Sequence, residues 1–106
     1  MVNCFKYLTE KQKEFILSKQ LLRSGTSFGA NVEEAIGGQS GKDFYAKMYI
    51  AYKEARETHY WLRLLRDTDF LDKPISESLL ADNDEILKLI GSILKTLKSK
   101  NQTANS

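Results

Sequence analysis

Apolar and small residues recur at alternating intervals of four and three along three long stretches of the chain. Such a series follows one face of a helix, and over several turns it predicts helices that pack nearly parallel, at about 20°. No stretch keeps the apolar–polar alternation that is typical of a strand. The sequence therefore predicts an all-α protein. The three series are Leu17, Leu21, Ser24, Phe28, Asn31 and Ala35, then Phe44, Met48, Ala51, Ala55, Thr58, Leu62 and Leu65, and finally Leu79, Asn83, Ile86, Ile90, Ile93 and Leu97.

The first long helix has a start signal and a stop signal in the sequence. Thr9 followed by Gln12 matches the capping-box pattern, which predicts that the helix begins here. The glycine pair at 37–38 predicts that it ends at about Ile36. Only a short apolar stub, residues 2–8, precedes this helix.

Two further long helices are predicted from similar signals. Ser40 is a favoured N-cap residue, and Asp43 in the first turn suits the helix dipole, so the second helix is expected to run to about Arg66. Pro74 is tolerated in a first helical turn and marks the start of the last helix, which we expect to fade after Lys98. The chain is therefore predicted to have three long helices after an N-terminal stub.

Length and charge limit the class of protein. The 106 residues fit one domain, predicted at residues 1–100, and the polar residues 101–106 are expected to fray. The net charge of +2, from 16 Lys and Arg against 14 Asp and Glu, is too even to indicate a nucleic-acid binder by itself. The sequence has neither a secretory signal nor an apolar run of the roughly 20 residues that span a bilayer, so we expect a cytoplasmic protein.

No catalytic residue, cofactor or metal site is predicted. The single cysteine, Cys4, excludes an intrachain disulfide and a site built from several thiolates. The single histidine, His59, has Arg56 three positions before it, so the Glu-x-x-His pairs of di-iron bundles are absent. The glycine-rich residues 37–42 lack the spacer and the Gly-Lys-Ser/Thr ending of a phosphate loop, and we interpret them as a turn between helices.

A mixed polar face accompanies the seams of the first two long helices. Arginine suits a bidentate carboxylate contact, so we hypothesise that Arg23 pairs with Glu54 or Glu57, between helices or across a subunit boundary. Breaking such a pair costs about 3–5 kcal/mol when it is fully buried. The alternative is a set of solvated charges, each contributing little. The predicted structural network contains Arg23, Ser27, Asn31, Glu34, Glu54 and Glu57.

A stripe of tyrosines and basic residues runs beside the seam of the second long helix. Tyrosines can stack on bases while arginines hold phosphates, a combination used for single-stranded nucleic acids. Tyrosines beside a core seam also serve as packing or subunit-interface residues, and both interpretations stay open. The stripe contains Tyr45, Tyr49, Tyr52, Arg56, His59, Arg63 and Arg66.

Two segments carry a family resemblance. Residues 21–35 read Leu-Leu-Arg-Ser-Gly-Thr-Ser-Phe-Gly-Ala-Asn-Val-Glu-Glu-Ala, and residues 53–62 read Lys-Glu-Ala-Arg-Glu-Thr-His-Tyr-Trp-Leu, with Asp-Phe at 43–44 between them. Over about residues 9–98 the chain resembles the bacterial four helix bundle protein family, also described as 23S rRNA intervening-sequence proteins. The resemblance implies an up-and-down four-helix bundle, here with a shortened first helix, that assembles as a ring-like homo-oligomer, a pentamer.

Two functions are compatible with these observations. The first is a non-enzymatic oligomeric scaffold or adaptor that binds a protein or nucleic-acid partner and no membrane. The alternative is an RNA- or DNA-binding protein associated with rRNA intervening sequences or retroelements. The resemblance suggests the alternative, because the family is similar to accessory proteins of diversity-generating retroelements, which bind nucleic acid and a reverse transcriptase.

Overall fold

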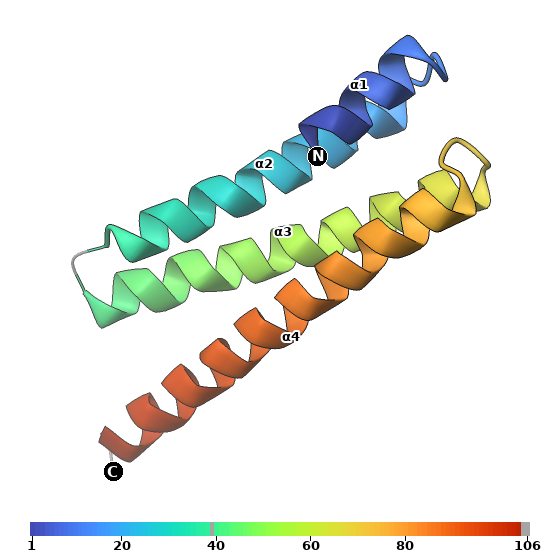
Figure 1. Cartoon of the computed structure of the whole chain (residues 1–106). Coiled ribbons are helices and arrows are strands. Elements are labelled where there is room, and N and C mark those ends of the chain that lie inside the picture. Colours follow the sequence, from blue (N-terminus) through green and yellow to red (C-terminus); the bar gives the residue numbers. More distant parts are fainter. Residues whose placement is uncertain (39, 105–106) are drawn as a thin grey trace.

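The chain folds into an antiparallel helical bundle, which is shown in Figure 1 as a computed structural model. The structure describes residues 1–38 and 40–104, with side chains up to residue 100. Within this part of the chain there are four helices and no strand: α1 (Val2–Glu10), α2 (Ile16–Ile36), α3 (Gly41–Asp67) and α4 (Lys73–Ala104). Helix α3 lies between α2 and α4, and α1 folds back along the first half of α2. The prediction of an all-α bundle with a short first helix is confirmed.

The start of the first long helix was predicted wrongly. Helix α2 begins at Ile16, because the chain is already helical from Val2 and a break with Lys13 at φ 56° separates the two helices. Thr9 lies in the last turn of α1, where its hydroxyl donates to the carbonyl oxygen of Phe5 at 3.0 Å instead of capping a new helix. The first turn of α2 is capped by a residue that the pattern did not single out, Glu14.

Glu14 is a buried carboxylate at the positive end of α2. One of its oxygens accepts the backbone N–H of Leu17 at 2.9 Å, and the other accepts that of Ser18 at 3.4 Å. The residue is only 7% exposed, so its charge is satisfied mainly by these donors.

Replacing this carboxylate should destabilise the bundle. We expect Glu14→Ala to lower the free energy of unfolding by about 1–2 kcal/mol, because two amides at the helix start lose their acceptor. Urea unfolding followed by circular dichroism measures the change. Glu10→Ala is the matched control, since Glu10 is exposed at the end of α1 and should change stability by less than about 0.5 kcal/mol. Equal midpoints for the two variants would contradict the capping role.

The remaining helix boundaries agree with the sequence signals except at the last one. The Ser40 hydroxyl accepts the backbone N–H of Asp43 at 3.1 Å, as expected of an N-cap, and residues 37–38 form part of the turn between α2 and α3. Gln39, in the same turn, lies outside the described residues. Helix α4 begins at Lys73 as predicted but continues past Lys98 to Ala104, so the predicted end was too early. Residues 105–106 of the predicted frayed tail lie outside the described residues.

The core consists of two apolar clusters separated by a polar layer. The α3 seam is buried from Met48 to Leu65, as its four-three spacing predicts. In the layer between the clusters, the Ser24 and Thr58 hydroxyls are hydrogen-bonded at 2.9 Å, and Asn83 is buried on α4. The first cluster contains Leu8, Leu21, Leu62, Leu65, Leu71 and Leu80, and the second contains Ala35, Met48, Ile90 and Leu94.

Helix α1 is too short to cover the bundle from end to end. At 1.5 Å per residue it spans about 14 Å, against about 32 Å for α2. It runs antiparallel to α2, and its N-terminus reaches only the middle of α2 (Figure 1). There the Met1 side chain contacts Gly25 so closely that a Cβ added to Gly25 would lie 2.7 Å from Met1 Cγ. Among the described residues, no helix covers the next part of α2 and α4. We call this surface the open apolar face: Phe28, Val32, Ile36, Ile86, Leu89 and Ile93.

Candidate functional site

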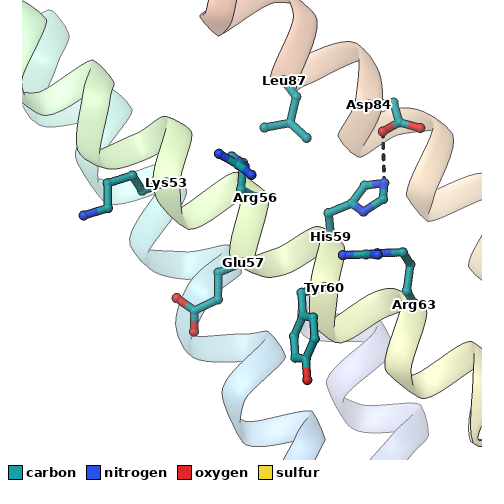
Figure 2. Close-up of a pocket in the computed structure, with 8 residues that line it drawn as sticks. All are labelled: Lys53, Arg56, Glu57, His59, Tyr60, Arg63, Asp84 and Leu87. Atoms are coloured by element: carbon teal, nitrogen blue, oxygen red, sulfur yellow. Dashed lines mark ion pairs between the residues drawn. The ribbon is translucent and has the colours of Figure 1, made fainter.

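The predicted tyrosine–cation stripe runs along the side of α3 that faces α4. Three of its members pack toward α4. Tyr45 and Tyr52 contact the second core cluster, and His59 Nε2 lies 3.0 Å from Asp84 Oδ1 (Figure 2). Tyr49, Arg56 and Arg63 are exposed on the outer edge of α3. The structure therefore divides the stripe into a packing edge and an exposed edge.

A hollow of about 630 Å³ lies between α3 and α4 in the middle of the stripe. The Arg63 guanidinium lies 5.9 Å from the ring centroid of Tyr60, within cation–π range. Asp84 points from α4 to His59 on α3, and its carboxylate partly offsets the positive charge of the hollow (Figure 2). The arrangement suits an anionic ligand with a planar group that can stack on the Tyr60 ring. The lining residues are Lys53, Arg56, Glu57, His59, Tyr60, Arg63, Asp84 and Leu87.

A second hollow, of about 280 Å³, continues the same side toward the end of α4. The rings of Tyr45 and Tyr49 stack there with centroids 6.4 Å apart, and Tyr52 lies against Gly91. This hollow adds two lysines that the sequence analysis missed, because they lie on another helix. A spacing signal was present for Lys98, which continues a three-four series on α4 through Asp84, Leu87, Gly91 and Leu94, but not for Lys95. The hollow is lined by Tyr45, Tyr49, Tyr52, Gly91, Leu94, Lys95 and Lys98.

Arg66, at the other end of the stripe, has an acidic partner of its own. Its Nε donates to Asp67 Oδ1 at 2.9 Å, and this hydrogen bond raises the pKa of Arg66. With Arg63, Arg66 lines another hollow, of about 300 Å³, that is also lined by Glu77 and Asp84. Its charge is therefore offset locally, and Arg66 is a weaker candidate for a phosphate contact than Arg56 or Arg63.

Arg23 of the predicted polar network lies between two carboxylates of α3. Its guanidinium contacts Glu54 at 3.4 Å and forms a short ion pair with Glu57. Glu57 also accepts the Trp61 indole N–H at 3.1 Å, and Gln20 accepts the Arg23 Nε–H at the same distance. The structure therefore forms the hypothesised Arg23 contacts within one chain, between α2 and α3.

The other members of that set do not join the Arg23 cluster. Asn31 donates to the carbonyl oxygen of Ser27 at 2.9 Å, a contact within α2. Glu34 pairs with Lys47 of α3 at 2.7 Å. The predicted network is thus three local groups along the α2–α3 contact.

The exposure of Arg23 lowers the expected effect of removing it. Its side chain is 48% exposed and that of Glu57 is 34% exposed, so solvent screens the pair. We expect Arg23→Ala to lower the free energy of unfolding by about 1 kcal/mol, well below the 3–5 kcal/mol limit for a buried pair. Thermal unfolding measures the loss of stability, and Lys88→Ala, which removes an exposed lysine, is the control variant. A loss above about 3 kcal/mol would show that the pair is buried in an assembly.

Metal ligation, membrane spanning and the single thiol are the remaining features of the described part of the chain. There, no group of three or more His, Cys, Asp or Glu side chains is placed to hold a metal ion. None of the helices in the described residues is both long enough and apolar enough to cross a membrane. Burial raises the pKa of the Cys4 thiol, which packs against the first core cluster.

These features define a small antiparallel helical-bundle protein. Residues 1–92 match the 23S rRNA-intervening sequence protein family, and the chain belongs to this family, as the resemblance indicated. The chain is also similar to a crystal structure of a protein with unknown function from the S23 ribosomal protein family of Bacteroides thetaiotaomicron. The two are 53% identical with a TM-score of 0.86, and the match covers 89% of this chain and 87% of that one. No curated protein matches the sequence.

Proposed function

We propose that this protein is a cytoplasmic, non-enzymatic scaffold or adaptor that works as a homo-oligomer. The observation that supports the proposal best is the open apolar face beyond the end of α1. Two of its residues, Ile36 and Leu89, are 70% and 64% exposed, and the partly buried residues beside them extend the surface along both helices. Contiguous apolar surface of this kind is uncommon on monomers and is typical of a protein–protein contact.

A second copy of the chain is the occupant that we propose for this face. A bundle of this type has room for a fourth helix along its whole length, and α1 fills only the first part. On α2, Gly29 has no atom within 4 Å of an added Cβ, so another helix can approach its backbone closely. Burying one Leu or Ile side chain contributes about 1.5–3 kcal/mol, so Ile36 and Leu89 together supply a substantial part of the free energy that association requires.

Solution mass tests this proposal. Sedimentation or light scattering at micromolar concentration should give a multiple of 12.1 kDa, and the pentamer that the family resemblance implies corresponds to five times that value, about 60 kDa. A single 12.1 kDa species would contradict the oligomeric scaffold.

A second candidate function is binding of single-stranded RNA or DNA along α3 and α4. The two neighbouring hollows combine aromatic rings with basic side chains on a side of the bundle separate from the open apolar face. Exposed Tyr49 and Tyr60 offer faces for base stacking, and Arg56, Lys95 and Lys98 offer phosphate contacts. Because the two surfaces do not overlap, a ring of copies could present several such sites together.

Salt dependence tests the second candidate. Affinity for a single-stranded oligonucleotide should fall with a slope of about −0.7 per phosphate contact on a log–log plot of binding constant against salt. Absence of binding to both RNA and DNA at about 50 mM salt would exclude the nucleic-acid function while leaving the scaffold proposal intact.

A further inference from the structure

A further hollow lies in the polar layer between the two core clusters, at the edge of the open apolar face, with which it shares Phe28 and Ile86. Its volume is about 220 Å³, and most of its wall is apolar. Ala55, a small residue of the α3 seam, leaves volume on one wall that a larger side chain would fill. The Met1 side chain lies over one side of it, against Gly25. The hollow is lined by Met1, Gly25, Phe28, Ala55, Thr58, Leu79, Asp82, Asn83 and Ile86.

Asn83 is the polar group that distinguishes this hollow from a packing defect. The residue is 6% exposed, and its Oδ1 atom has no hydrogen-bond partner among the residues that the structure describes. A buried amide oxygen without a donor is costly and is uncommon in native structures. The neighbouring hydroxyls do not supply one, since Thr58 bonds to Ser24 and to the carbonyl oxygen of Glu54.

We propose that this hollow binds a small, uncharged aromatic molecule that carries one N–H or O–H donor. The donor pairs with Asn83 Oδ1, and the ring packs between Phe28 of α2 and Ile86 of α4. The volume agrees with this class, because an apolar protein cavity of about 150 Å³ accommodates benzene and 220 Å³ leaves room for a second small ring. Asp82 at the rim disfavours an anion, and the mostly apolar wall disfavours a charge of either sign, so the ligand is neutral.

Such a ligand would join the three long helices at the middle of the bundle. Met1 is flexible and its thioether contacts aromatic rings favourably, so its side chain can move aside and then cover the ligand. The hollow shares Phe28 and Ile86 with the open apolar face, but Asn83 and Ala55 belong to neither proposed surface, so variants at these two positions test the ligand separately from self-association and nucleic-acid binding.

Indole and indene are the probes that test it, since they have nearly the same shape and only indole has an N–H. Amide chemical-shift mapping of the full chain should show indole binding with saturation below about 1 mM and shifts concentrated at Gly25, Ala55 and Ile86. Indene should bind about tenfold more weakly, which corresponds to the loss of one hydrogen bond.

Two variants separate the donor contact from nonspecific apolar binding. Asn83→Leu should remove the preference for indole over indene, because it keeps the volume and deletes the acceptor. Ala55→Leu should fill the hollow and abolish binding of both probes, and if it fails to fold, the Asn83→Leu comparison still decides. No shifts at the three named residues, equal affinities of the two probes for the wild-type chain, or an unchanged preference in Asn83→Leu would each overturn the proposal.

Discussion

The double variant Ile36→Glu, Leu89→Glu is expected to sediment as a 12.1 kDa monomer under conditions in which the wild-type chain is a multiple of that mass. Both residues lie on the open apolar face and are largely exposed in the single chain, so charges there are tolerated by the fold. In an interface the same charges would be desolvated without partners. Loss of two apolar contacts of about 1.5–3 kcal/mol each corresponds to at least a hundredfold weaker association.

Ile50→Glu is the matched control for this variant. Ile50 is 39% exposed on α3, on the side of the Arg23 cluster and away from the open apolar face. The control should keep the wild-type mass, and all three proteins should have the same helical content by circular dichroism. Dissociation of Ile50→Glu with an intact mass for the double variant would place the interface on the α2–α3 side and contradict the proposed contact.

The seams and most helix boundaries could be predicted because they depend on local sequence. The four-three series identified the residues of α3 that are buried, and Ser40 and Pro74 marked helix starts correctly. Thr9 does not mark a helix start, because a capping box has the same residue pattern whether or not the chain before it is already helical. Glu14 could not be identified as a cap, since its burial depends on the fold of the α1–α2 connection.

The candidate surfaces were only partly predictable because they form between helices. The stripe on α3 was read from spacing, but the sequence could not show that Tyr52 and His59 face α4 while Arg56 and Arg63 remain exposed. The lysines of the second hollow belong to a helix that becomes adjacent only through antiparallel packing of α3 and α4. The pairing of Arg23 could be inferred from residue types, whereas its exposure, which sets its energetic weight, could not.

The exposed arginines of α3 are expected to carry most of the nucleic-acid affinity. Arg56→Glu, Arg63→Glu should weaken binding of a single-stranded oligonucleotide by about a hundredfold, because a charged hydrogen bond contributes about 1.5–3 kcal/mol and two are lost. The slope of the salt dependence should fall by about 1.4, from two fewer phosphate contacts. Arg66 is kept, because its replacement by Glu beside Asp67 would add repulsion within the fold.

Net charge alone must be separated from this local effect. The control variant Lys6→Glu, Lys19→Glu reverses two exposed lysines on α1 and α2. Its net charge changes from +2 to −2, as in the arginine variant, since each substitution removes two charge units. If the tyrosine–cation surface is the site, this control keeps most of the wild-type affinity and slope, and both variants keep the wild-type sedimentation. Equal losses of affinity in the two variants would mean that any binding reflects the overall electrostatic field of the protein. Dissociation of Arg56→Glu, Arg63→Glu into monomers would instead make the outer edge of α3 a subunit interface, because charge reversal at a solvent-exposed site leaves the assembly intact.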